Sequence, residues 1–230
     1  MFLEMLELIH QIKNLQEVEL KFAKQCAVEE VTRWSSWTKG VAETLRFRNK
    51  VFENFLSALQ QAGKIQYLTI KNLQDYHNKS IFERQDFRII RDRLPQLHLQ
   101  IAAEYDEASP EYTIEKPALH AGYTQDLPNT WLKPLSGQLT HLTLYGAESM
   151  CMWGIWPLVD FCNIPTFAHL KSLSFGRFTV VHDWQIDWIL SHAETLEELI
   201  PDDCPIVTAL YMDDKPAKAS FPDLPILRSG

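Results

Sequence analysis

Leu139-Thr-His-Leu142-Thr-Leu144 decides the fold, because its pattern returns at Leu170-Lys-Ser-Leu173-Ser-Phe175 and at Leu196-Glu-Glu-Leu199-Ile-Pro201. Apolar residues occupy positions 1, 4 and 6 of each run, and mostly polar residues lie between them. One such run predicts a β-strand. Several runs that each follow a helical pattern predict a stack of strand–helix repeats.

Three earlier runs share the pattern and begin at Leu15, Ile65 and Leu94, so the six repeats begin at 15, 65, 94, 139, 170 and 196. Several of the intervals lie in or just above the usual range of leucine-rich repeats, about 20–29 residues. The first interval is longer and leaves room for a degenerate repeat, whose strand would be Glu43-Thr-Leu45-Arg-Phe47. Residues 104–134 carry four prolines and no clear periodicity, which predicts a loop insertion.

Helical spacing of apolar residues predicts the segments between the strands. We expect a helix over residues 2–12, with Phe2, Met5, Leu6, Ile9 and Ile12 at helical spacing, and a helix over residues 81–93, with Phe82, Phe87 and Ile90 inward. Asp183 is the expected N-cap of another helix. A further helix carries Phe52, Phe55, Leu56 and Leu59 and ends near Gly63.

The resulting fold class is α/β. We expect an irregular leucine-rich-repeat solenoid over residues 1–212, with a parallel strand ladder on its concave face and helices on its convex face, followed by an irregular tail over residues 213–230. Because strand side chains alternate, positions 3, 5 and 7 of each run should point away from the helices. The residues expected to contact a partner are Glu17, Glu19, Lys21, Tyr67, Thr69, Lys71, Gln96, His98, Gln100, His141, Thr143, Tyr145, Ser172, Ser174 and Glu198.

This surface is acidic at both ends and neutral, hydrogen-bonding and aromatic in the middle, which favours a protein or peptide partner. The alternative is a surface that is only solvated. A net charge of −8 argues against general nucleic-acid binding. The basic cluster from Arg84 to Arg93 also contains Asp86 and Asp92, and we interpret it as the solvated face of a helix.

No signal peptide or membrane span is evident, and the four cysteines form no C-x-x-C pair. These features favour an intracellular protein, cytoplasmic or nuclear, with reduced thiols and no membrane partner. Cys151 and Cys162 are interpreted as core thiols, and the tryptophans of the connecting segments as plugs between strands and helices. The acidic pairs Asp202-Asp203 and Asp213-Asp214 are interpreted as caps and turns, not as a metal site.

Motifs for catalysis or cofactor binding are missing from the sequence, including H-E-x-x-H, G-x-S-x-G and a phosphate-binding glycine loop. We therefore expect neither an enzyme nor a cofactor.

The run Leu196–Cys204 matches the repeat L-x-x-L-x-L-x-x-C, and it continues as Leu-Glu-Glu-Leu-Ile-x-Asp-Asp-Cys-Pro. This stretch resembles the leucine-rich-repeat part of fungal F-box proteins, although Pro201 stands where that family has an apolar strand residue. The resemblance implies substrate recruitment to a cullin–RING ubiquitin ligase through a Skp1-type adaptor. An F-box sequence is not found, so we expect either a fragment or an orphan repeat domain that does not bind the adaptor itself.

Two alternatives remain at this stage. The chain could be a leucine-rich-repeat scaffold or inhibitor unrelated to ubiquitin, or a regulator of a GTPase. One leucine-rich-repeat family of GTPase regulators has a strongly acidic tail. Here the tail carries Lys215, Lys218 and Arg228, which argues against that class.

Overall fold

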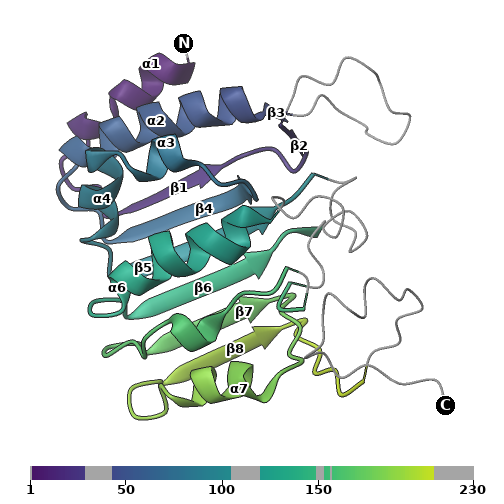
Figure 1. Ribbon diagram of the computed structural model, residues 1–230. Coiled ribbons are helices and arrows are strands. Elements are labelled where there is room, and N and C mark those ends of the chain that lie inside the picture. The colour runs from purple at the N-terminus through teal and green to yellow at the C-terminus, as the bar shows by residue number, and fades with distance from the viewer. Residues whose placement is uncertain (1, 29–42, 105–119, 149–152, 156, 210–230) are drawn as a thin grey trace.

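The computed structural model describes residues 2–28, 43–104, 120–148, 153–155 and 157–209, which form an α/β fold on one six-stranded sheet (Figure 1). Every strand is parallel to its neighbours, and the order across the sheet is the order along the chain. The strands are β1 (Glu17–Lys21), β4 (Tyr67–Gln74), β5 (Gln96–Ala102), β6 (His141–Gly146), β7 (Ser172–Gly176) and β8 (Glu198–Asp202). The sheet is open, with β1 and β8 at its edges. The predicted α/β class and parallel strand ladder are confirmed.

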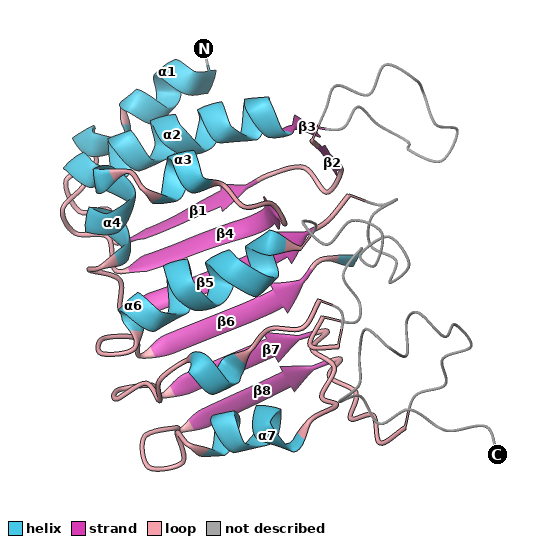
Figure 2. Ribbon diagram, in the orientation of Figure 1, coloured by secondary structure: helices cyan, strands magenta, loops and turns pink. Residues whose placement is uncertain are grey.

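The helices lie on one face of the sheet (Figure 2). This arrangement is expected when consecutive parallel strands are neighbours and every crossover has the same hand. The helices are α1 (Phe2–Glu7), η1 (Ile9–Gln11), α2 (Leu45–Gln61), α3 (Lys79–Phe82), α4 (Gln85–Arg91), η3 (Gly122–Leu132), α6 (Lys133–Leu135), η5 (Phe161–Asn163) and α7 (Asp183–Leu190). A separate two-stranded sheet pairs β2 (Cys26–Ala27) with β3 (Glu43–Thr44).

The apolar positions of the repeat form the core between sheet and helices. In the four runs that begin at Ile65, Leu94, Leu139 and Leu170, none of the residues at positions 1, 4 and 6 is more than 2% exposed. At the edge, by contrast, Leu199 of β8 is 46% exposed. It occupies the same repeat position as Leu173, but β8 has a neighbouring strand on one side only. The inward half of the predicted register is therefore confirmed for the inner strands.

The connection between β5 and β6 contains a helix that the sequence did not suggest. The predicted loop at 104–134 is wrong for residues 122–134, which form the π-helix η3 and the start of α6, while residues 105–119 lie outside the described part of the chain. Tyr123, Leu127, Trp131 and Leu135 are spaced by four residues and are buried against the sheet. Pro128 lies inside η3, and the wider hydrogen bonding of a π-helix suits a residue that would clash with an α-helical carbonyl.

The predicted helix at 81–93 is divided in two. Arg84 has extended backbone angles (φ −65°, ψ 143°), and it separates α3 from α4. The apolar residues Phe82, Phe87 and Ile90 point inward as predicted.

The basic cluster on this segment is not a solvated face throughout. Arg93 donates to the carbonyls of Leu59 (2.7 Å) and Ala62 (3.0 Å) and so caps the C-terminal end of α2. The Arg91 side chain is only 12% exposed and donates to the Thr130 carbonyl at 2.9 Å. Among the arginines of α4, Arg88 does lie in solvent.

Two local predictions in the N-terminal part need correction. Glu43–Phe47 is not a strand of the main sheet, because the hydroxyl of Thr44 accepts a hydrogen bond from the Phe47 N–H at 3.2 Å and starts α2. The segment at 2–12 is helical, but it consists of a short α-helix followed by a 3₁₀ turn. Of its apolar residues at helical spacing, Leu6 is buried, whereas Met5 and Ile12 are exposed.

Two further predictions need correction near the C-terminal end. The N-cap of α7 is His182, one residue before the expected Asp183, and Gln185 Oε1 accepts from the His182 N–H at 3.0 Å. Cys162 is exposed, not a core thiol, and in the short 3₁₀ helix η5 the buried residue is Phe161. Trp131 and Trp153 are buried plugs as predicted, whereas Trp34, Trp37, Trp156 and Cys151 lie outside the described residues.

Candidate functional site

The candidate site is the sheet face turned away from the helices, here called the polar face. Its side chains come from alternate residues of all six strands, and the parallel register aligns them in rows. The first row is Glu17, Tyr67, Gln96, His141, Ser172 and Glu198, and the second is Glu19, Thr69, His98, Thr143, Ser174 and Ile200. The third is Gln100, Tyr145, Gly176 and Asp202. Lys21 pairs with Lys71, which lies in the register irregularity of β4 between Ile70 and Leu73.

The structure thus brings all fifteen predicted contact residues onto one surface. Two of them, Thr69 and Ser174, are nevertheless buried, because these short side chains lie in a row between longer neighbours. The remaining predicted residues are exposed or partly exposed. They are the ones available to a partner.

An aromatic and acidic group extends over this face from β5 to the edge strand β8. The rings of His98 and Tyr145 stack with centroids 5.9 Å apart and planes 18° apart. The Tyr145 hydroxyl donates to Asp202 Oδ2 at 2.8 Å, so Tyr145 on β6 reaches over β7 to β8. Burial, and then the hydrogen bond to Asp202 and its negative charge, raise the pKa of Tyr145 to about 12. Tyr145 is therefore neutral and its ring is held in place at physiological pH.

Gly176 makes this crossing possible. It lies between Tyr145 and Asp202 in the third row. A Cβ atom at residue 176 would be 2.0 Å from two carbons of the Tyr145 ring. Only glycine leaves room for the ring to lie flat across β7.

Opposite charges form an ion pair on the polar face between β1 and β4. Lys71 Nζ lies 2.8 Å from Glu19 Oε2, and both side chains are partly exposed. Burial and then the positive charge of Lys71 lower the pKa of His98, while Glu19 opposes this shift. His98 is therefore a neutral ring at physiological pH. On the other side, the Ser172 hydroxyl donates to Glu198 at 2.7 Å.

Asp202 belongs to the candidate site although it was not among the predicted contact residues. It follows the run Leu196–Pro201 and so occupies position 7, which points to this face. The proline at residue 201 argued that the strand ends before Asp202. In the structure β8 continues through Pro201, which is paired with Phe175. Proline is tolerated there because an edge strand has one side without a ladder partner.

A buried histidine–carboxylate pair lies elsewhere, at the C-terminal end of β4. His120 Nδ1 is 2.5 Å from Asp75 Oδ2, and the Tyr123 N–H donates to Asp75 Oδ1 at 3.1 Å. The two side chains of the pair are 2% and 0% exposed, so a substrate does not reach them. These contacts connect the start of η3 to the end of β4. Burial raises the pKa of Tyr123, which lies beside Asp75, well above its usual value.

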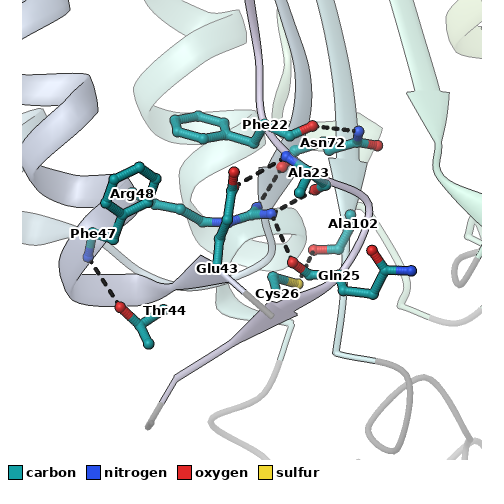
Figure 3. Close-up of polar contacts among 10 residues, drawn as sticks. All are labelled: Phe22, Ala23, Gln25, Cys26, Glu43, Thr44, Phe47, Arg48, Asn72 and Ala102. Carbon is teal, nitrogen blue, oxygen red and sulfur yellow. Dashed lines mark hydrogen bonds and ion pairs between the residues drawn. The ribbon is translucent and has the colours of Figure 1, made fainter. Parts of the chain in front are cut away.

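Arg48 is the most deeply buried cation, and its donors are directed at the chain itself (Figure 3). Its two terminal nitrogens donate to the carbonyls of Asn72 (2.7 Å) and Ala23 (2.6 Å), and its Nε lies 3.2 Å from Glu43 Oε2. Burial lowers the pKa of Arg48, an effect that the charges of Cys26 and Glu43 oppose. Arg48 joins α2 to the ends of β1 and β4 and is not an anion site.

Within the described residues, groups of three or more histidines, cysteines or acidic residues that could hold a metal ion are absent. The described helices include none with the length and apolarity needed to cross a bilayer. No protein-family model matches the chain, and neither a curated protein nor a solved structure is significantly similar to it. The polar face must be interpreted from its own chemistry.

Proposed function

We propose that the chain is a protein-interaction module that binds a protein or peptide on the polar face. The observation that carries this proposal is the alignment of uncovered polar and aromatic side chains in rows across six hydrogen-bonded strands. A partner would meet side chains whose backbone is already ordered, which lowers the entropic cost of binding. The stacked rings of Tyr145 and His98 would form the central contact, since interface energy concentrates on such aromatic anchors.

The charges of the polar face favour a particular kind of partner. Glu17 and Glu19 lie at one end, and Glu198 and Asp202 lie at the other. Basic or polar groups of a protein would complement these carboxylates, whereas the phosphates of a nucleic acid would be repelled. A chemical step is not part of the proposal.

We further propose that the repeats form a leucine-rich-repeat solenoid, with the polar face as its concave side, in an intracellular protein of the cytoplasm or nucleus. The parallel strands in chain order support this, as does the resemblance of Leu196–Cys204 to fungal F-box proteins. In such a protein the module would bind the substrate of a ubiquitin ligase. It should retain no Skp1-type adaptor by itself, and retention of the adaptor would contradict the assignment.

The test of the polar face is a double charge reversal, Glu17→Lys with Glu19→Lys. Both residues lie on the exposed edge strand β1, so folding should be preserved, although the ion pair to Lys71 is lost. A matched control, Asp187→Lys with Glu194→Lys, makes the same charge change on exposed residues at α7, on the helix side. The measurement is quantitative affinity purification from cells, followed by mass spectrometry.

Proteins that bind the polar face should be retained by the wild type and by the control, and reduced at least about tenfold in the β1 variant, which corresponds to about 1.4 kcal/mol. If the β1 and α7 variants retain the same proteins in the same amounts, the polar face is a solvated surface. A large loss of thermal stability in the β1 variant would show that the assigned register is wrong.

A further inference from the structure

A second surface, on the helix side of the sheet, carries a cavity of about 480 Å³. Residues of α3, α4 and η3 line it together with His77, which follows β4. The volume falls within the range of small-molecule sites, about 300–1,000 Å³. Phe82 gives the cavity an apolar wall that belongs to the core.

The charges lining this cavity are mainly positive, in a chain whose net charge is −8. Lys79, Arg88 and Arg91 contribute cations, and Glu83 contributes the single carboxylate. Lys79 Nζ lies 3.6 Å from Glu83 Oε1 with both side chains largely exposed, so this pair is weak and Lys79 can turn to a ligand. Arg88 forms neither an ion pair nor a side-chain hydrogen bond with any residue in the described part of the chain.

Two further side chains of the cavity are fixed in position before any ligand arrives. Arg91 is held by the Thr130 carbonyl at 2.9 Å and by Asp92, and it lies over the Phe87 ring. His77 Nδ1 is 2.8 Å from Oδ1 of the buried Asp126. That carboxylate fixes the ring. His77 Nε2 can donate to a phosphate oxygen only in the imidazolium form, in which both ring nitrogens carry a hydrogen.

We propose that this cavity binds a phosphate monoester. A phosphate dianion needs several cations around it, and this cavity is lined by Lys79 of α3 and by Arg88 and Arg91 of α4. Arg88 carries the positive charge without a described carboxylate partner, so it contributes most of the affinity. The phosphate belongs either to a small phosphorylated molecule or to a phosphorylated side chain of another protein.

The test is a titration of the ¹⁵N-labelled full chain with inorganic phosphate and with O-phosphoserine at constant ionic strength, followed by two-dimensional NMR. Serine serves as the control without phosphate. The amide signals of His77, Lys79 and Thr130 should shift and saturate with a dissociation constant on the order of 1 mM. Serine should leave them unchanged.

Arg88→Gln should weaken the binding about tenfold. Arg46→Gln, which removes an exposed arginine from the first turn of α2, is the matched control and should leave the affinity almost unchanged. A serine-phosphorylated peptide that binds more tightly than O-phosphoserine would assign the phosphate to a protein partner, and equal affinities would assign it to a small molecule. The proposal is overturned if the shifts do not saturate at the cavity, or if both arginine variants weaken binding equally.

Discussion

At the scale of single residues, the polar face depends on which side chains are small. The repeat pattern places Tyr145, Gly176 and Asp202 in one row, but a pattern of apolar positions does not specify that a ring lies across a strand. The contact requires the missing side chain of Gly176 and the carboxylate of Asp202 at 2.8 Å from the Tyr145 hydroxyl. Glycine here is a requirement of space, not of backbone angle, since it is not among the residues with positive φ.

Gly176→Ala should therefore lower the free energy of unfolding by about 1–3 kcal/mol, because the new methyl group overlaps the Tyr145 ring. Chemical denaturation measures this change. Gly137→Ala is the control, since a Cβ atom there meets nothing within 4 Å and should cost little. In the Tyr145→Ala background, Gly176→Ala should become nearly neutral. A full cost in that background would place the clash elsewhere.

At the scale of elements, the helices were harder to predict than the strands. The strands repeat one hexapeptide pattern, whereas each connection between strands packs against the sheet through different residues. Pro128 and Pro134 concealed η3 and α6, although Tyr123, Leu127 and Trp131 follow helical spacing. The end of α2 is set by Arg93, a residue far away in the sequence, which the local sequence around Gly63 does not reveal.

Arg93→Met should destabilise the protein by about 1–3 kcal/mol, because the carbonyls of Leu59 and Ala62 lose a charged donor in a partly buried place. Arg88→Met, on the exposed side of the same segment, should change stability by less than about 0.5 kcal/mol. Urea denaturation compares the two variants. Equal effects would show that helix propensity, and not the cap, determines the cost.

At the scale of the whole molecule, stability should follow position in the sheet. Each inner strand packs between two neighbours, while β8 has one, and the exposure of Leu173 and Leu199 differs accordingly. Stability in such a stack is approximately a sum of nearest-neighbour terms. One repeat position can therefore carry very different energies in different strands.

Leu173→Asp should unfold at least the C-terminal half, with a cost above about 4 kcal/mol, because it buries an unpaired carboxylate in the core. Leu199→Asp, at the same repeat position in β8, should cost less than about 1 kcal/mol, because water already reaches this side chain. Circular dichroism and hydrogen exchange distinguish the two outcomes. Comparable unfolding by both variants would show that β8 is covered as fully as β7.

The sequence by itself determined the repeated strands, their inward leucines and the alignment of the polar face, because side-chain alternation and parallel pairing follow from the spacing of apolar residues. Only the tertiary structure decided which arginines face solvent, where η3 runs and how Tyr145 reaches Asp202. These features depend on contacts between residues far apart in the chain. The cavity at Arg88 belongs to this second group, since His77, Arg88 and Thr130 meet only after the crossovers have packed against the sheet.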